Sequence, residues 1–407
     1  MSASRRLKIC YVVPGSDLVA TMGPTRNVLN LARAMRPLAD VSVAFRRVSD
    51  RIAPEGLSIL QIAPDATHDR ADDAATSGMG YLEFLRYLRE VRRFVARDLA
   101  GFDVILEKSW LLSGYVSALC ASRGLPGIPV ENIVQNPGHA ARQQWTKLMR
   151  LKLGAWVARR NMQKAPVVIA ETEFLKREIH QHWGVPEDRI AVVHLGVDGT
   201  LFRPIDQAEA RRKLGLSSDA LILTYVGVLD WTHNLEPAIK SLFGPSPQEL
   251  ELHVIGDGAR RGEYESMSRD CPRKLRFYGK VPHADVPWHI AAADLCLAPY
   301  DSAAFASGEL GYSTMKIPEY LSVGRAIVSV PSGRVRSLIE NGRTGFLFPN
   351  EQADWRNFLG ALPSRARLAE MGAAAAAAPQ MTWESTAQAY YEVCVRALQA
   401  ARAGRGD

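Results

Sequence analysis

The chain has 407 residues, too many for one ordinary hydrophobic core, so we expect two large domains. Its 47% hydrophobic and 23% charged residues are typical of a globular protein and exclude long disordered tracts. Fifty lysines and arginines against 43 acidic residues give a formal charge of +7, but no nucleic-acid-binding motif accompanies this excess, so nucleic acid is not an expected partner.

The five cysteines are scattered, mostly in apolar runs, and no pair has the spacing of a zinc site. We interpret them as reduced, buried residues of a cytoplasmic protein. The first apolar run, residues 8–14, is too short for export or for crossing a membrane and has the length of a β-strand. We therefore expect a cytoplasmic protein, with contact at a membrane surface left open.

Strand-length apolar runs alternate with helical patterns through the first half of the chain. Such alternation predicts a parallel sheet covered by helices. The runs lie at residues 8–14, 41–46, 103–109, 165–171 and 190–196.

The alternation restarts after residues 194–215, a connector rich in Gly, Pro and Asp. We therefore expect an α/β fold with two doubly wound, Rossmann-like domains, residues 1–199 and 200–380, facing each other across a central cleft. A final helical segment, residues 381–407, is expected to pack back toward the first domain. Ligands of open parallel sheets bind at the carboxyl ends of the strands, so the cleft is the predicted site. The second series of runs lies at residues 221–229, 251–258, 274–281, 293–299 and 326–331.

Two segments, residues 84–97 and 145–164, are basic, helical and amphipathic. Such helices suit an anionic membrane surface or an anionic acceptor. They are equally compatible with ordinary solvated faces, so peripheral membrane contact is one of two interpretations.

Residues 307–328, SGELGYSTMKIPEYLSVGRAIV, combine a glycine-rich loop, a helix start and an apolar strand. Ser313 or Thr314 is expected to cap the helix, with Pro318 in its first turn. Backbone N–H groups at a helix start favour an anionic or hydroxyl-rich ligand, and Glu319 can accept hydrogen bonds from sugar hydroxyls. The alternative is that Lys316 and Glu319 form an ordinary surface pair three residues apart.

Four segments carry a specific resemblance through their order and spacing: residues 192–204, 253–261, 275–299 and 313–349. Together they resemble the GT-B retaining glycosyltransferases of family four. The resemblance implies transfer of a sugar from a nucleoside diphosphate sugar to a hydroxyl acceptor (a glycan, a lipid or a small natural product) by a hexosyltransferase-type enzyme. It implies no metal and no cofactor besides the sugar nucleotide, and the sequence contains no Asp-x-Asp cluster.

The resemblance also implies roles for residues on the donor side. Glu319 would hold the ribose hydroxyls, and the loop with Glu309, Leu310 and Gly311 would hold sugar hydroxyls and phosphate, largely through backbone N–H groups. Gly256, in the sequence GDG, would let the backbone approach the nucleotide, although a tight strand-to-helix turn explains it equally well.

Three further residues follow from the same resemblance. Val281 would bind the nucleotide base through its backbone, Gly23 lies in a loop that would approach the donor phosphate, and His139 would lie next to the donor sugar. Each has a structural alternative: Val281 as a plain strand end, Gly23 as part of a loop-to-helix entry, and His139 as a structural histidine.

Two departures from the family pattern concern charge. Relatives commonly carry an Arg and, five residues later, a Lys after the first strand of the second domain, where this chain has Val228 and His233. We expect His233 and Lys316 to supply the missing positive charge near the leaving diphosphate. Relatives often also have a glutamate eight residues before the one matched by Glu319, where this chain has Gly311.

These departures leave a second class of function open. A GT-B-like protein that binds a nucleotide or sugar without turnover would also explain Val228. A peripheral membrane adaptor is a third interpretation, based on the two basic helices.

Overall fold

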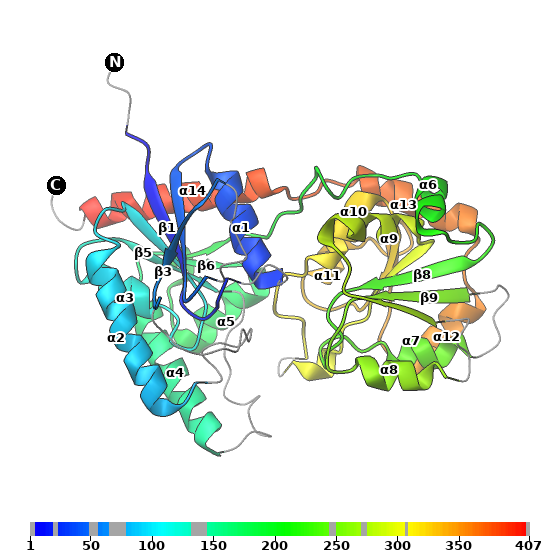
Figure 1. Cartoon of the computed structure of the whole chain (residues 1–407), viewed down its shortest axis with the longest axis horizontal. Helices are drawn as coiled ribbons and strands as arrows, with labels where there is room; N and C mark the ends of the chain where they lie inside the picture. Colours follow the sequence, from blue (N-terminus) through cyan, green and yellow to red (C-terminus); the bar gives the residue numbers. More distant parts are fainter. Residues whose placement is uncertain are drawn as a thin grey trace. The chain divides into compact units, whose positions relative to one another are not determined.

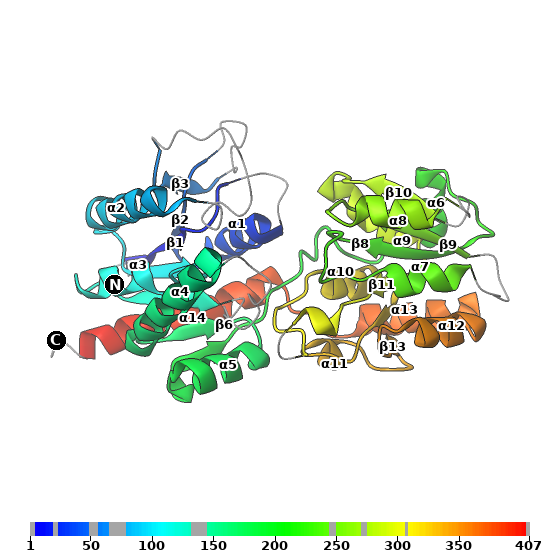
Figure 2. The same cartoon turned by 90° about the horizontal axis from the view of Figure 1, so that it is seen from below.

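The computed structural model describes residues 5–18, 23–48, 56–64, 79–131, 145–243, 250–269, 275–305 and 308–403. The chain divides into two compact units, one formed by Met1–Leu195 with Trp383–Asp407 and the other by Gly196–Thr382. The expected domain ends, residues 199 and 380, lie close to these boundaries. Each unit is a parallel sheet with helices on both faces (Figures 1 and 2). The expected α/β class with two doubly wound domains is thus confirmed.

The first unit contains a seven-stranded sheet in the order β3-β2-β1-β4-β5-β6-β7, and all its strand pairs are parallel. Ile9 of β1 lies opposite Val41 on one side and Val104 on the other, so β1 and β4 are the two strands between which the order reverses. The strands are β1 (Lys8–Val13), β2 (Asp40–Phe45), β3 (Ser58–Gln61), β4 (Val104–Lys108), β5 (Gly127–Glu131), β6 (Val168–Ala170) and β7 (Ile190–Val192).

Helices cover both faces of this sheet because its strands are apolar on both sides. Cys10 and Val12 of β1 pack into a cluster with Phe84 of α2, whereas Tyr11 between them faces Tyr390 of α14. Helix α14 also packs against α1. The helices are α1 (Gly23–Met35), α2 (Tyr81–Arg97), α3 (Tyr115–Ala121), α4 (Trp145–Lys164), α5 (Glu173–Trp183) and α14 (Trp383–Ala403), with a 3-10 turn at Glu187–Arg189.

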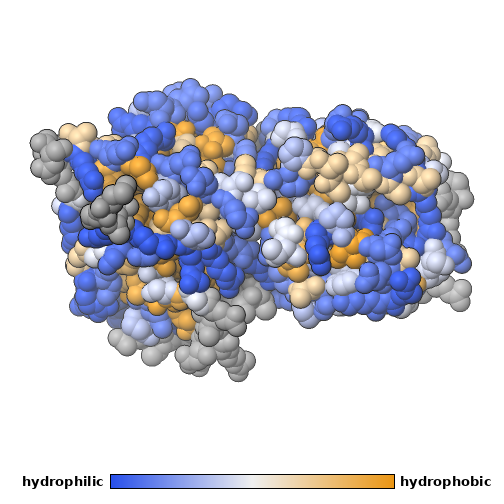
Figure 3. Space-filling model, turned by 90° about the horizontal axis from the view of Figure 1, so that it is seen from above, coloured by the Kyte–Doolittle hydropathy of each residue, from blue (hydrophilic) through white to orange (hydrophobic). Residues whose placement is uncertain are grey.

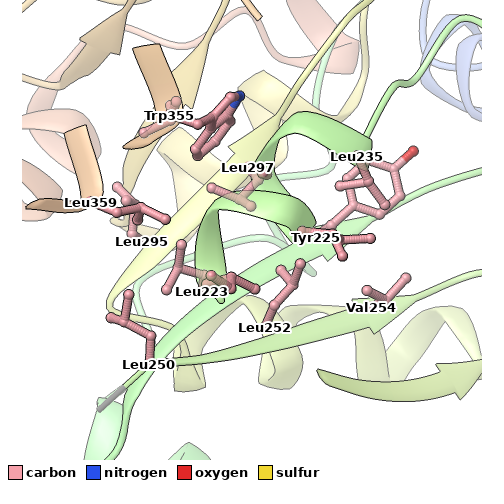
Figure 4. Close-up of a cluster of buried hydrophobic side chains, with 14 of the residues drawn as sticks. Leu223, Tyr225, Leu235, Leu250, Leu252, Val254, Leu295, Leu297, Trp355 and Leu359 are labelled. Atoms are coloured by element: carbon pink, nitrogen blue, oxygen red, sulfur yellow. The ribbon is translucent and has the colours of Figure 1, made fainter. Parts of the chain in front are cut away.

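The second unit contains a six-stranded parallel sheet in the order β10-β9-β8-β11-β12-β13. Side chains alternate along β11: Leu295 and Leu297 join a cluster with Trp355, part of which Figure 4 shows, while Cys296 joins the cluster on the opposite face. The strands are β8 (Leu221–Val226), β9 (Leu250–Ile255), β10 (Leu275–Gly279), β11 (Leu295–Ala298), β12 (Ala326–Ser329) and β13 (Gly345–Leu347).

The helices of the second unit form the two layers that cover this sheet. Helices α7 and α12 pack against each other on one face, and α9 and α10 pack against each other on the opposite face. The helices are α6 (Gln207–Leu214), α7 (Glu236–Leu242), α8 (Arg261–Met267), α9 (Val286–Ala292), α10 (Lys316–Val323), α11 (Val335–Leu338), α12 (Gln352–Gly360) and α13 (Arg365–Ala377), with 3-10 turns at His283–Asp285 and Ser302–Ala304.

Hydrophilic residues predominate on the face shown in Figure 3. Among the helices that the structure describes, none combines the length and the apolar character needed to cross a membrane. The four cysteines in the described ranges are all buried free thiols, as expected.

Candidate functional site

The loops that follow β8, β9 and β10 are joined to one another by their backbones at the carboxyl edge of the second sheet. Gly227 N donates to Ile255 O at 2.9 Å, and Gly256 N donates to Gly279 O at 2.8 Å. This edge is where open parallel sheets bind their ligands. The site is therefore built on three rigidly connected strand ends.

Close packing of these loops explains the glycine at position 256. Its φ of 133° lies in a range that residues with side chains rarely adopt, and a Cβ there would come within 1.8 Å of Gly227 O. The contact is with backbone, so no side-chain movement can relieve it. Contact with the protein's own backbone is thus enough to require glycine at this position. The expected approach of Gly256 to a nucleotide stays a prediction.

Lys316, the first residue of α10, lies buried beside the end of β8. Its Nζ donates to the Tyr225 hydroxyl at 3.2 Å and lies 4.4 Å from the centre of the Tyr225 ring and 5.3 Å from that of Tyr300. Within the described residues, no carboxylate oxygen lies within 4.0 Å of Lys316 Nζ, the distance of an ion pair. Lys316 is thus a buried amine held by aromatic groups, and the alternative of an ordinary surface pair with Glu319 does not fit it.

Burial lowers the pKa of Lys316 to about 7, because the charged ammonium loses its hydration, while Asp230 and Glu319 act in the opposite direction. Near neutral pH the amine is therefore a mixture of its charged and neutral forms. An anion placed beside it would favour the charged form.

His233 is bound on one side to a carboxylate. Its Nδ1 lies 2.8 Å from Asp230 Oδ1, and the same oxygen accepts hydrogen bonds from the Thr232 N–H at 2.9 Å and the Thr232 hydroxyl at 2.7 Å. Burial and the neighbouring Lys316 lower the pKa of His233 to about 4, although Asp230 opposes the shift. The imidazole is neutral at pH 7, so in this state it does not supply the positive charge expected of it.

Asp230 stays ionised. Burial favours its neutral form, but hydrogen bonds from His233 and Thr232 outweigh that effect and hold the pKa of the carboxyl below its ordinary value. With Asp230 accepting from Nδ1, the other ring nitrogen of His233 faces the Tyr312 hydroxyl at 3.4 Å.

The start of α10 differs from the expected capping arrangement. Met315 is the residue before the helix and no side chain caps it. Ser313 Oγ instead accepts from Arg334 at 2.8 Å, and the Thr314 hydroxyl bonds to that of Tyr300. The prediction of a Ser313 or Thr314 cap was wrong because tertiary partners occupy both hydroxyls. Pro318 lies in the first turn, as predicted.

The loop before α10 is held by the turn after β12. Leu310 is buried, and its N–H donates to Ser332 Oγ at 2.8 Å, while Glu309 Oε1 accepts from Arg336 at 3.1 Å. That donor already has a partner in the protein, so the expected use of the Leu310 N–H to bind a ligand stays a prediction. Gly311 is half-buried in the same loop.

The remaining predicted residues lie in separate places. Glu319 is half-buried in the first turn of α10, and Val281 follows β10 and packs against the apolar cluster of α9. Gly23 begins α1 of the first unit, and His139 lies outside the described residues. Val228 is 56% exposed at the end of β8.

Sequence reasoning missed Tyr225, Tyr312 and Asp230. The available signal for Asp230 was its position three residues before His233, a spacing that lets a carboxylate reach an imidazole in one turn. Tyr225 and Tyr312 had no such signal, since their neighbours come from other parts of the chain. No group of three or more His, Cys, Asp or Glu side chains in the described ranges is arranged to hold a metal ion.

A polar cavity of about 710 Å³ lies at the same edge of the second sheet. Its walls come from the ends of β11, β12 and β13 and from the starts of α7 and α12, and they include Tyr300, Glu309 and Arg336. Glu309 therefore lines a hydrophilic space next to the loop that carries Tyr312.

Comparisons with known proteins decide the family. Residues 220–362 match the family model described as "Glycosyl transferases group 1", and residues 22–200 match that described as "Glycosyltransferase Family 4". The chain belongs to glycosyltransferase family 4. The expected hexosyltransferase-type enzyme is thereby confirmed.

The relatives of this family 4 glycosyltransferase include D-inositol 3-phosphate glycosyltransferases. That of Geodermatophilus obscurus is 26% identical over 369 residues, which cover 85% of this chain and 78% of the relative. That of Thermobispora bispora is 27% identical over 407 residues, which cover 91% of this chain and 89% of the relative.

Solved structures of GT-B proteins share the fold. Anabaena HepE in complex with UDP and glucose has a TM-score of 0.73 at 17% identity, covering 95% of this chain and 98% of HepE. Sucrose-phosphate synthase from Thermosynechococcus elongatus has a TM-score of 0.69 at 18% identity, covering 98% of this chain and 99% of the synthase. The family 4 glycosyltransferase therefore has the GT-B fold that its sequence indicated.

Proposed function

We propose that the protein transfers a sugar from a nucleoside diphosphate sugar to a hydroxyl acceptor, with retention of the anomeric configuration. The single observation that carries the proposal is the amine of Lys316. It is buried at the ligand-binding edge of the second sheet and, within the described residues, has a tyrosine hydroxyl and aromatic rings as neighbours rather than a carboxylate. A buried cation without an internal counter-ion suits an anionic ligand.

The chemistry of transfer requires such a cation. Breaking the bond between the sugar and the diphosphate leaves negative charge on the departing phosphate oxygen, and a fixed positive group beside it lowers the barrier. The attraction is stronger in a buried site than in water. In this proposal Lys316 supplies the charge, no metal ion is invoked, and a donor phosphate oxygen takes the proton of the acceptor.

The other predicted residues have positioning roles in this proposal. Glu319 accepts hydrogen bonds from the donor ribose, and Val281 and Gly256 place their backbones along the nucleotide. Glu309 contacts the sugar, which the polar cavity that it lines supports. Gly23 and His139 of the first unit are assigned to the donor phosphate and the donor sugar.

The comparisons give independent support for the donor class. HepE was solved in complex with UDP and glucose. The base, the sugar and the acceptor of the present protein are left to experiment.

The test begins with calorimetric titration of UDP, GDP and dTDP into the wild-type protein and Lys316→Met. We expect one nucleotide to bind the wild type and its affinity to fall about tenfold to a hundredfold in the variant, as for the loss of one charge-assisted hydrogen bond. Lys213→Met is the matched control, since Lys213 stacks on Trp288 elsewhere in the unit. Failure of all three nucleotides to bind would refute the proposed function.

Val228 favours one alternative, a binding protein that holds a sugar nucleotide without turnover. An exposed valine in place of the family arginine removes a permanent charge from the loop after β8. Mass spectrometry of reactions with a panel of UDP-, GDP- and dTDP-sugars and mixed hydroxyl acceptors separates the two functions. A donor that binds but is neither transferred nor hydrolysed would favour the binding protein.

We also propose a peripheral contact between α4 and an anionic membrane. Leu153 and Trp156 are 59% and 54% exposed on this helix, and Arg159 and Arg160 are exposed beside them. Apolar and basic side chains on one helix face complement an anionic lipid surface. Flotation with vesicles containing phosphatidylglycerol should carry the wild type upward but leave a Leu153→Ser, Trp156→Ser variant in solution; a wild type that stays in solution contradicts the contact.

A further inference from the structure

The loop after β8 holds an ionised carboxylate, Asp230, against a neutral imidazole, His233. Asp230 Oδ1 lies 2.8 Å from His233 Nδ1 and is itself fixed by two hydrogen bonds from Thr232. This contact requires the neutral imidazole to carry its proton on Nδ1. The lone pair of Nε2 is then directed toward the Tyr312 hydroxyl, in the loop before α10.

Groups from every neighbouring element face this imidazole. Asp230 comes from its own loop, Lys316 from α10, and Tyr225, Tyr300 and Tyr312 from β8, the end of β11 and the loop before α10. The one carboxylate among them contacts Nδ1. Among the described residues, the Tyr312 hydroxyl faces Nε2, and the nearby amine of Lys316 disfavours a positive charge on the ring.

A bound diphosphate changes this balance. Its oxygens would add negative charge near His233 and Lys316, which favours the protonated form of both groups. The imidazolium would then lie between two anions, Asp230 on Nδ1 and a phosphate oxygen on Nε2. The charge that Val228 does not provide is in this way created by the ligand.

We propose that His233 takes up a proton from solvent when the sugar nucleotide binds, and that Asp230 is the positioning residue that makes this possible by holding Nδ1–H. The inference rests on the proposed function, because it requires a diphosphate in this site. No covalent bond is formed or broken; one proton moves from the buffer to Nε2. The site therefore gains positive charge when the sugar nucleotide binds.

Proton uptake is measured by titrating a sugar nucleotide into the protein in two buffers with different enthalpies of ionisation. The probes are UDP-glucose, GDP-mannose and dTDP-glucose, whose diphosphate diesters do not titrate near pH 6. At pH 6 Lys316 is already mostly charged, so uptake at this pH reports on His233. We expect the binding enthalpy of the wild type to depend on the buffer, and the dependence to be lost in His233→Gln and Asp230→Asn.

Asp219→Asn is the matched control, since Asp219 is an exposed aspartate just before the opposite, amino end of β8. It should retain both binding and buffer dependence. If a sugar nucleotide binds the wild type with the same enthalpy in both buffers, the inference fails while the proposed function stands. If none of the three binds, the proposed function fails.

Long-range ¹H–¹⁵N NMR spectra of the histidine rings test the same inference without calorimetry. The signals of His233 are those missing from His233→Gln. We expect the free protein to show the ring with its proton on Nδ1, and the saturated protein to show protonation at both nitrogens. In Asp230→Asn the second protonation should disappear, which a merely structural role of Asp230 would not cause. A His233 ring that stays neutral at saturation overturns the proposal.

Discussion

The amine of Lys316 lies directly against the backbone of Gly227: a Cβ at residue 227 would be 2.8 Å from Nζ and 3.0 Å from the Tyr225 hydroxyl. The φ of Gly227 is 150°, which also disfavours a side chain. The end of β8 is thus shaped around the side chain of a helix that begins almost ninety residues later, and this relationship can be tested by substitution.

Gly227→Ala should displace the ammonium of Lys316 and so weaken nucleotide binding, by about tenfold if one charge-assisted contact is lost. Gly256→Ala should destabilise the fold more, since its Cβ would meet the backbone oxygen of Gly227 at 1.8 Å. Calorimetric titration and urea unfolding measure the two effects. Gly262→Ala is the control: a Cβ there has no neighbour within 4 Å, and alanine favours the helix by up to about 1 kcal/mol. Equal nucleotide affinity and equal free energy of unfolding in all three variants would contradict these roles of Gly227 and Gly256.

Lys316→Met should stabilise the protein at neutral pH while it weakens nucleotide binding. Burial lowers the pKa of Lys316 from 10.5 to about 7, so folding is opposed wherever the unfolded lysine is charged. The resulting decrease in the free energy of unfolding is largest at and below pH 7, with an upper limit of about 4 kcal/mol at pH 7. It disappears as the pH rises toward 10.5.

Thermal unfolding of Lys316→Met and the wild type between pH 7 and pH 10 measures this difference. We expect the gap between the two melting temperatures to narrow steadily as the pH rises. A gap that stays constant or widens would mean that the ammonium is compensated in the folded state.

The histidines at positions 253 and 289 should make the second unit sensitive to acid. Burial lowers the pKa of both imidazoles below 6.5, and the buried His289 Nδ1 has no hydrogen-bond partner among the described residues. Because their folded pKa values are lower than the unfolded ones, both groups reduce stability as the pH falls below about 6.5.

His289→Phe should therefore lose less stability than the wild type between pH 7.5 and pH 5 in urea unfolding. His182→Phe is the control, since His182 is 59% exposed in the first unit. An unchanged pH dependence in His289→Phe would show that the acid sensitivity has another source.

Glu319→Ala should reduce the affinity for the donor nucleotide by about tenfold to a hundredfold, through loss of charge-assisted hydrogen bonds to the ribose. The fold should be unaffected, because the side chain is half-buried and exchange of glutamate for alanine is well tolerated in a helix. Comparison of a ribonucleotide with its deoxyribose form sharpens the measurement, since the variant should discriminate less between them. Glu340→Ala, at an exposed position, is the control and should retain full affinity. Full affinity in Glu319→Ala would show that Glu319 does not bind the ribose.

The sequence was sufficient for the two sheets because alternation of strands and helices is a local pattern, repeated in each half. The apolar runs that begin at Ile9 and Leu221, for example, are both central strands. Pro318 was placed correctly for the same reason: its position depends on the helix that contains it.

Features that depend on distant partners could not be predicted in this way. The hydroxyls of Ser313 and Thr314 suit a helix cap, but Arg334 and Tyr300 engage them instead. The ionisation of His233 and Lys316 depends on burial by residues from separate segments of the chain, so the sequence indicated the residue types but not their charge. Gly256 was singled out for an approach to the nucleotide, which stays a prediction, whereas its close contact with Gly227 comes from a distant part of the chain and had no local signal.

The two units differ in how the chain builds them. The second is one continuous stretch, Gly196–Thr382, whereas the first needs α14 from the far end of the chain, with Tyr390 buried against the face that carries Tyr11. During synthesis the amino-terminal unit therefore emerges first but is completed last, after the second unit already has all its residues. Until Trp383–Ala403 leaves the ribosome, α14 cannot cover the apolar face beside α1, and an apolar face exposed during synthesis promotes aggregation.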